Sequence, residues 1–362
     1  MTTPRDHGGR LDAAIARHGG MRADWLDLST GINPLAYPLP PLAGDVWTAL
    51  PDRAAADALT QAARRFWAVP DGAAVLAAPG ASALIARLPA CLTTHQTMGL
   101  TRGPAAGPIA GPTGAPTGGV AGGVAGGVAG GVTGGPVGGV AGGSVAIPGP
   151  TYNEYSAAFV AAGWTVADQA DPATGAMVVV HPNNPDGRLW RARDLGAATL
   201  IIDESFCDIA PDASLIALAA RPGVVVLKSF GKFWGLAGLR LGFAIGDPAI
   251  LAQLAQALGP WPVSGPALGI GTAALGDPGW ALDTRARLTR DAARLDGLMA
   301  GAGASAIGGT TLFRLYQVGD AAAWQARLAR ARVLGRTFPY NPGWLRLGLP
   351  HPDRWPQIEA AL

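Results

Sequence analysis

The chain has 362 residues, enough for two domains with large cores, and its net charge of +2 shows no Lys/Arg stripe typical of nucleic-acid binding. The two cysteines, Cys91 and Cys207, are too few for a disulfide framework and are not spaced as in metal-binding motifs, so we expect no bound metal. The sequence has no apolar run long enough to predict a membrane span, and its first ten residues lack the apolar core of a signal peptide. We therefore expect a cytoplasmic protein with neither nucleic acid nor membrane as partner.

The first 44 residues predict an arm. A short helix is expected over 10–18, followed by the proline-rich text LDLSTGINPLAYPLPPL, which favours extended chain on the surface. From Asp45 to Trp67 the apolar spacing predicts helices broken at Pro51.

A strand is predicted over Ala74–Ala78, and a glycine turn after it opens a helix. The turn is formed by Gly80, Ala81 and Ser82. Free N–H groups and the helix dipole at such a turn favour an anion, although most turns of this kind bind nothing.

Residues 101–145 differ from the rest of the chain. They hold 18 of the 53 glycines, a single charged residue (Arg102) and a GGVA period of four. This period matches neither collagen nor a heptad, and the side chains are too small to build a core. We interpret the segment as a flexible insertion in a loop between a helix and a strand; a structured glycine-rich element is the alternative.

Beyond the insertion, strands and helices alternate, which predicts an α/β sheet. Several strands are continuous Val/Ile runs, as in a parallel sheet covered on both faces. The predicted strands are Ser144–Pro148, Met177–His181, Leu200–Asp203, Val224–Leu227 and Gly242–Ile245. Helices are expected at Tyr155–Ala162 and Ala210–Ala220.

The C-terminal part predicts a smaller α+β domain. Residues 266–300 are helical in pattern, and residues 304–362 mix strands at Thr311–Val318 and Trp344–Leu347 with a helix at 321–332. We therefore divide the chain into an arm (1–44) that joins the small domain, a large domain (45–258) and a small domain (259–362).

The only two lysines of the protein, Lys228 and Lys232, lie in VVVLKSFGKFWGLAGLRLG, whereas the other 25 basic side chains are arginines. A lysine can lose its proton and form a Schiff base, which arginine cannot. Ser229 lies three residues before Lys232 and Arg240 eight residues after it. This pattern favours a carbonyl cofactor that carries a phosphate; we expect Lys228 to be a solvated or phosphate-neighbouring charge.

Three further motifs accompany the lysine: HPNNPDGR with Asn184, LIIDES with Asp203, and WLRLG with Arg346. Together they resemble the fold-type I pyridoxal-phosphate enzymes of the aminotransferase class I/II group, from about residue 7 to residue 346 without the insertion. The resemblance implies the aminotransferase-like fold: a mainly parallel sheet sandwiched by helices, plus the small α+β domain.

The resemblance also implies roles. Lys232 would bond covalently to pyridoxal 5'-phosphate, Asp203 would pair with the ring nitrogen and Asn184 with the ring hydroxyl. The cofactor phosphate would be bound by Ser229, Arg240 and the turn of Gly80, Ala81 and Ser82. Tyr152, which could equally be a core residue, would stack on the ring, and Arg346 would bind the substrate carboxylate.

The ends of the chain are similar to the threonine-phosphate decarboxylase branch of this group. His7 in HGG, Gly31 in STGINPL and the text PWPVS carry this likeness. It implies a small phosphorylated amino acid as substrate, with His7, Gly31 and Arg336 among its contacts, and decarboxylation of L-threonine O-3-phosphate in cobalamin biosynthesis by a homodimer. The alternatives are a histidinol-phosphate-type aminotransferase and a non-catalytic binding protein.

Two positions depart from the family pattern. Phe206 stands where many relatives have a tyrosine that reaches the cofactor ring, and Leu50 precedes Pro51 where aminotransferases often have a tyrosine that crosses the dimer. We expect both to alter contacts to the cofactor without removing an essential group.

Overall fold

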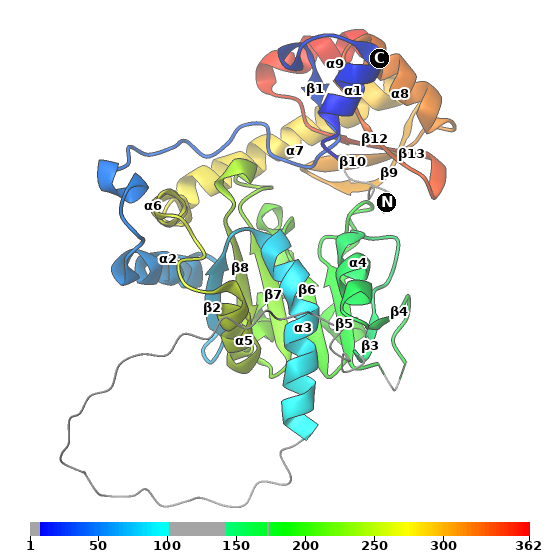
Figure 1. Cartoon of the computed structure of the whole chain (residues 1–362). Helices are drawn as coiled ribbons and strands as arrows, with labels where there is room; N and C mark the ends of the chain where they lie inside the picture. Colours follow the sequence, from blue (N-terminus) through cyan, green and yellow to red (C-terminus); the bar gives the residue numbers. More distant parts are fainter. Residues whose placement is uncertain (1–7, 101–141, 172–173) are drawn as a thin grey trace, which may run out of the picture.

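A computed structural model describes residues 8–100, 142–171 and 174–362 (Figure 1). His7 and most of the predicted insertion lie outside the described residues. The last part of that prediction overlaps a strand, because β3 begins at Ser144. None of the helices in the described ranges is long and apolar enough to cross a membrane.

The larger part of the molecule is built on a seven-stranded sheet with the order β2-β8-β7-β6-β5-β3-β4. Neighbouring strands are parallel except around β8, which is antiparallel to both β2 and β7. The strands are β2 (Ala74–Ala78), β3 (Ser144–Ala146), β4 (Thr165–Ala167), β5 (Ala176–Val180), β6 (Thr199–Asp203), β7 (Val224–Ser229) and β8 (Gly242–Gly246). The predicted mainly parallel α/β sheet is confirmed.

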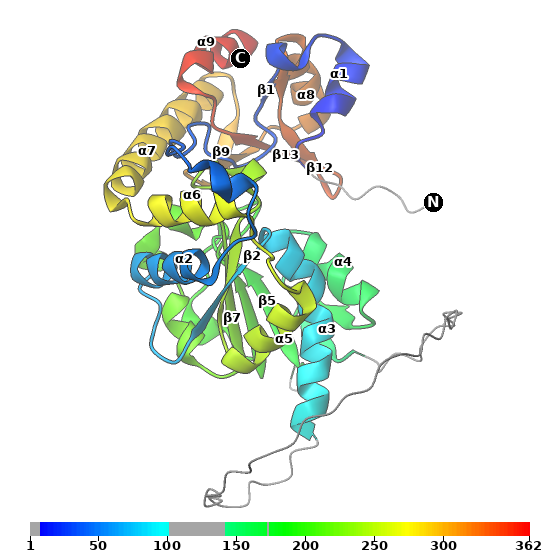
Figure 2. The same cartoon turned by 60° about the vertical axis from the view of Figure 1, so that its left-hand side comes forward.

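Helices cover both faces of this sheet, because successive strand residues point to opposite sides. On β7, Val225 packs with α3 (Ala81–Leu100), α4 (Glu154–Ala161) and α5 (Pro248–Leu258). Its neighbour Val226 packs with α2 (Arg53–Phe66), α6 (Gly265–Leu275) and α7 (Pro278–Gly301). Figure 2 shows α3 and α5 on one side of the sheet and α2 and α6 on the other.

The smaller part is an antiparallel sheet with the order β12-β13-β10-β9, as the predicted α+β region requires. Its elements are β9 (Ser305–Thr310), β10 (Phe313–Gln317), α8 (Ala321–Arg330), β11 (Val333–Leu334), β12 (Arg336–Phe338), β13 (Asn341–Gly348) and α9 (Trp355–Ala361). The helix α7 runs from the large sheet to this one (Figure 1).

The N-terminal segment lies against this smaller part. Helix α1 (Leu11–His18) is followed by β1 (Leu26–Asp27), which pairs in parallel with β11. The proline-rich text is extended as predicted, but it is not confined to the surface. Leu28 and Asn33 are buried, and the Asn33 side chain donates a hydrogen bond to the carbonyl of Phe233 at 2.8 Å.

The helix predicted over Ala210–Ala220 is wrong: the structure forms two short 3-10 helices, Pro211–Ala213 and Ile216–Ala220. The side chain of Glu204 explains the break. Its carboxylate accepts hydrogen bonds from the Ser214 hydroxyl at 2.7 Å and from the Leu215 N–H at 2.5 Å. A backbone N–H bound to a buried carboxylate is not available for a continuous helix.

The expectation that Lys228 is a solvated charge is also wrong. Its side chain is 2% exposed, and its ammonium lies 2.6 Å from Glu204 and 3.6 Å from Asp208. Asp208 accepts two further hydrogen bonds from the indole N–H groups of Trp67 and Trp234, at 2.8 Å and 3.0 Å. Because of these two carboxylates the pKa of Lys228 is raised despite burial, so the side chain stays charged.

Replacing Lys228 by Met is predicted to lower the free energy of unfolding by about 3–5 kcal/mol, because two buried carboxylates lose their cation. Urea denaturation monitored by tryptophan fluorescence measures this loss. Arg53→Met is the matched control, since Arg53 and Asp57 form an exposed ion pair and its removal should leave no measurable change. A Lys228→Met protein as stable as the parent would contradict the prediction.

Candidate active site

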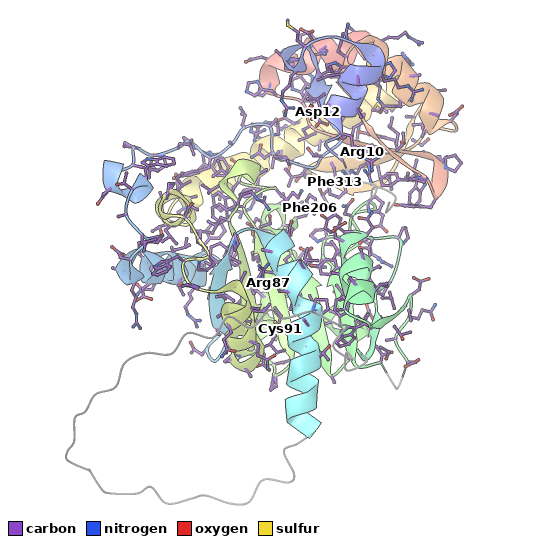
Figure 3. The ribbon with its side chains drawn as sticks, viewed as in Figure 1. Arg10, Asp12, Arg87, Cys91, Phe206 and Phe313 are labelled. Atoms are coloured by element: carbon purple, nitrogen blue, oxygen red, sulfur yellow. The ribbon has the colours of Figure 1, made fainter. Side chains whose placement is uncertain are left out.

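A cavity of ≈ 690 Å³ lies where the carboxyl ends of β5, β6 and β7 face the small sheet. Open α/β sheets bind their ligands at this edge. Phe206 from the large part and Phe313 from β10 meet beside it, with ring centroids 5.0 Å apart (Figure 3). The predicted site residues that line the cavity are Gly31, Ala81, Ser82, Tyr152, Asn184, Asp203, Ser229, Lys232, Arg240, Arg336 and Arg346.

Two predicted site residues are not among those that line the cavity. Gly80 lies directly behind the wall, in contact with Arg240. His7 is outside the described residues, and its neighbour Gly8 lines the cavity.

Lys232 lies in the turn after β7, partly exposed to the cavity. Burial and the positive charges of Arg346 and Arg240 lower the pKa of its amine to about 8, against an opposing effect of Asp203. The amine also lies 5.3 Å from the ring of Phe206. At neutral pH about a tenth of this amine is therefore deprotonated and nucleophilic, far more than for an ordinary lysine.

Asp203 ends β6 and is 3% exposed. Its carboxylate accepts hydrogen bonds from the Tyr155 hydroxyl and from the Ser205 N–H, both at 2.9 Å. Within the described part of the chain it forms no ion pair closer than 4.0 Å. Burial raises the pKa of Asp203, while these hydrogen bonds and Lys232 oppose the rise. The carboxylate is thus held in place and suited to a cationic group in the cavity.

The turn before α3 and the guanidinium of Arg240 form a cradle of the kind that binds a phosphate. Gly80 has φ +85°, which favours glycine, and a Cβ there would lie 2.6 Å from an Arg240 nitrogen, so the guanidinium lies directly against this turn. Ala81 and Ser82 open the 20-residue helix α3, whose first N–H groups favour an anion. The Ser229 hydroxyl, which accepts the N–H of Gly231 at 3.2 Å, faces the same end of the cavity.

Arg346 lies on β13 and is 5% exposed. One of its terminal nitrogens donates to the Asn184 side-chain oxygen and the other to the carbonyl of Ser29 at 2.6 Å. Its Nε is buried with no hydrogen-bond partner among the described residues. Burial and the nearby Arg336 lower the pKa of Arg346 to about 10. The guanidinium is therefore fixed in direction at the cavity wall, with one N–H donor unsatisfied.

Arg336 and Arg346 are paired across β12 and β13, so both cations face one end of the cavity. Gly31 lies against the two phenyl rings: a Cβ there would be 2.8 Å from Phe313 and 2.9 Å from Phe206. Tyr152 also lines the cavity, beside Tyr155, with ring centroids 6.4 Å apart. Burial raises the pKa of Tyr152 to about 12, so its hydroxyl stays protonated.

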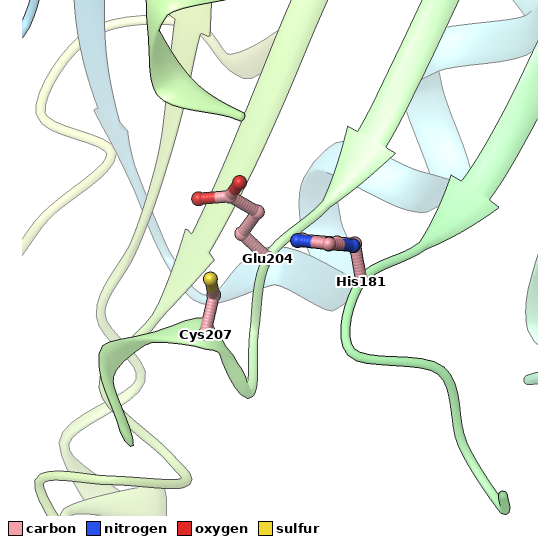
Figure 4. A group of neighbouring side chains, drawn as sticks. All are labelled: His181, Glu204 and Cys207. Carbon is pink, nitrogen blue, oxygen red and sulfur yellow. The ribbon is translucent and has the colours of Figure 1, made fainter. Parts of the chain in front are cut away.

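A second cluster of polar groups lies behind Asp203. The side-chain atoms of His181, Glu204 and Cys207 that are able to bind a metal ion lie within 4.8 Å of one another (Figure 4). His181 Nε2 bonds the Ala213 carbonyl at 2.7 Å, and its Nδ1 accepts the N–H of Trp190 at 3.0 Å. With Glu204 paired to Lys228, the imidazole and carboxylate are engaged within the protein, and this cluster ties loops together.

The residues present fit a phosphorylated carbonyl cofactor with a basic ring nitrogen. The amine of Lys232 can bond to the carbonyl carbon, and the cradle around Gly80 and Arg240 suits the phosphate. Asp203, buried and held by two donors, suits a protonated ring nitrogen.

The sequence reasoning missed Tyr155, whose hydroxyl bonds Asp203. The sequence held no local signal for this contact, because Tyr155 and Asp203 are 48 positions apart and lie on different elements.

Comparison with known proteins agrees with this geometry. The model of the family "Aminotransferase class I and II" matches residues 139–354. The chain is 38% identical to a threonine-phosphate decarboxylase of Sinorhizobium sp, over 96% of the chain and 94% of that protein. It is 34% identical to the threonine-phosphate decarboxylase of Pseudomonas aeruginosa, over 99% of the chain and 97% of that protein. The protein belongs to the aminotransferase class I and II family.

A histidinol-phosphate aminotransferase of Symbiobacterium thermophilum is 33% identical, but over only 41% of the chain and 47% of that protein. Solved structures share the fold. The histidinol-phosphate aminotransferase of Sinorhizobium meliloti, in complex with pyridoxal-5'-phosphate, aligns with a TM-score of 0.69 at 18% identity, over 97% of the chain and 93% of that structure. The aminotransferase-like fold predicted from the motifs is confirmed.

The two lysines allow a test of the lowered pKa. With the apoprotein and an acylating reagent, the reaction rate of Lys232 is expected to rise through a midpoint near pH 8, because only the neutral amine reacts. Peptide mass spectrometry at a series of pH values measures this rate. Lys228 should stay unmodified throughout, and in denatured protein both lysines should titrate near 10.5. A midpoint near 10.5 for Lys232 in folded protein would contradict the prediction.

Proposed function

We propose that this protein is a pyridoxal-phosphate enzyme that decarboxylates L-threonine O-3-phosphate to (R)-1-amino-2-propanol O-2-phosphate. The observation that carries the proposal is the near full-length similarity to two threonine-phosphate decarboxylases. The match to a histidinol-phosphate aminotransferase covers less than half of either chain. The cavity with its lysine, carboxylate and arginines supports the same chemistry.

When bound, pyridoxal phosphate supplies an electron sink for the bonds at the substrate's Cα. Lys232 would hold the cofactor before the substrate arrives and, with its pKa of about 8, exchange a proton near Cα at neutral pH. Asp203 would keep the ring nitrogen protonated, and Asn184 would contact the ring hydroxyl. Ser229, Arg240 and the turn of Gly80, Ala81 and Ser82 would bind the cofactor phosphate, with Tyr152 against the ring.

The opposite end of the cavity suits the charges of the substrate. Arg346, which lines the cavity, would bind the carboxylate, and Arg336 would bind the substrate phosphate together with Gly31 and His7. Phe206 lines the cavity and packs against Phe313, with ring centroids 5.0 Å apart. The reaction replaces the carboxylate on Cα by a proton and releases CO2. The two arginines would therefore have to orient the substrate so that the bond from Cα to the carboxylate is cleaved and the bond from Cα to hydrogen is not.

We extend the proposal to the setting of the enzyme. It would act in cobalamin biosynthesis, in the cytoplasm and as a homodimer. The division into an arm (1–44), a large domain (45–258) and a small domain (259–362) stays a prediction. Helix α6 falls in the predicted small domain by sequence, but it packs on α2, which covers the large sheet. The role of His7 also stays a prediction.

An aminotransferase acting on histidinol phosphate is the second candidate, because the cofactor end of the cavity would serve both reactions. The partial matches to histidinol-phosphate aminotransferases favour it. A non-catalytic binding protein has less support, since the site holds an amine of lowered pKa together with Asp203 and Arg346.

The purified protein with pyridoxal phosphate is expected to release CO2 from L-threonine O-3-phosphate and to transfer no amino group from histidinol phosphate to 2-oxoglutarate. Trapped CO2 and the phosphorylated amino alcohol are measured together. Lys232→Ala should lower the rate by at least about a hundredfold, and Lys232→Arg should not restore it, because arginine keeps the charge without a nucleophile. Transamination without CO2 release would refute the decarboxylase proposal.

Arg336→Met is predicted to raise the KM for L-threonine O-3-phosphate by about tenfold or more, through loss of a charge-assisted hydrogen bond to the substrate phosphate. Steady-state kinetics measure this effect. Arg330→Met is the control, because Arg330 is exposed on α8 and does not line the cavity. An unchanged KM in Arg336→Met would show that the substrate phosphate is bound elsewhere.

A further inference from the structure

We infer that Tyr155 is a positioning residue: its hydroxyl orients the Asp203 carboxylate toward the ring nitrogen of the cofactor and stabilises the ionised form of that carboxylate. This inference rests on the proposed function, because it needs pyridoxal phosphate in the cavity. It adds a residue outside the cavity wall to the machinery that binds the cofactor.

The first argument is the geometry of Asp203. One carboxylate oxygen accepts the Tyr155 hydroxyl and the other accepts the Ser205 N–H, both at 2.9 Å. The two donors come from different elements, since Tyr155 lies on α4 and Ser205 in the loop after β6. Each carboxylate oxygen is thus bound by a donor in a fixed direction. These two donors determine the plane of the carboxylate and prevent it from rotating relative to the cavity.

The second argument is electrostatic. Asp203 is 3% exposed, and among the described residues no cation lies within ion-pair distance of it. A buried carboxylate without a cation tends to become protonated, and a protonated Asp203 could not pair with a protonated ring nitrogen. Burial raises the pKa of Asp203, and the hydrogen bonds from the Ser205 side chain and N–H and from Tyr155, with the charge of Lys232, oppose that rise. The Tyr155 pKa is raised well above its usual value, so this residue remains a donor.

The third argument separates the hydroxyl from the ring. Tyr155 is fully buried, and its ring meets that of Tyr152 edge to face. Phenylalanine would keep this ring contact and the packing of α4 on the sheet. The change Tyr155→Phe therefore removes the hydrogen bond to Asp203 and little else.

The test compares two ligands that differ at one ring atom. Apoprotein is titrated with pyridoxal phosphate and with its 1-deaza analogue, in which carbon replaces the ring nitrogen, and binding is followed by tryptophan fluorescence. For Tyr155→Phe we expect the affinity for pyridoxal phosphate to fall about tenfold or more, as for the loss of a hydrogen bond to a charged group. The affinity for the analogue should stay unchanged, because the analogue has no ring nitrogen for Asp203 to pair with.

Tyr316→Phe is the matched control. Tyr316 is an equally buried tyrosine whose hydroxyl donates to Asp296 at 2.8 Å, in the small sheet and outside the cavity lining. It should bind both ligands like the parent. In addition, Tyr155→Phe should have no further effect on pyridoxal phosphate binding in an Asp203→Asn background, if the hydroxyl acts through Asp203.

Three results would overturn the inference: unchanged binding of pyridoxal phosphate, an equal loss for both ligands, or a Tyr155→Phe apoprotein that does not fold. The last two would assign the hydroxyl a structural role only. Failure of the unsubstituted protein to bind pyridoxal phosphate would instead refute the proposed function. Because binding is measured, the inference is tested independently of which substrate the enzyme uses.

Discussion

The ion pair between Lys228 and Glu204, buried between the ends of β6 and β7, is the contact on which the site depends. Each partner is the sequence neighbour of a residue in the cavity: Glu204 follows Asp203, and Lys228 precedes Ser229. The carboxylate of Glu204 also binds the loop after β6, through Ser214 and Leu215. A charge buried this deeply is costly unless every partner is in place, so the pair holds both strand ends in one arrangement.

In front of this pair the cavity has an excess of positive charge. Lys232, Arg240, Arg336 and Arg346 face it, with Asp203 as the buried carboxylate among them. Such a site suits a ligand with several anionic groups, and burial together with the same excess lowers the pKa of the lysine that has to act as a nucleophile. Binding and reactivity thus have one electrostatic origin, and the two lysines differ because one has carboxylates beside it and the other has arginines.

Much of the fold could be predicted because its strands are short apolar runs bounded by turns. The predicted ranges for β2, β6 and β8 agree with the structure to within a residue at each end. The helix prediction for residues 210–220 was wrong because it used only the local helical pattern. The carboxylate that interrupts the helix comes from Glu204, outside this segment. Lys228 was misjudged for the same reason: its partners Glu204 and Asp208 are distant in sequence and adjacent only in the folded sheet.

By itself, the sequence determined the kind of chemistry, since lysine, serine and arginine at fixed spacings after a strand are local features. The tertiary structure alone decided what each of the two lysines does, because a pKa depends on which charges approach from other elements and on how deeply the amine is buried. It also decided which side chains support the site from behind. Tyr155 reaches Asp203 only because α4 packs on the sheet opposite the end of β6, a contact that no spacing in the sequence encodes.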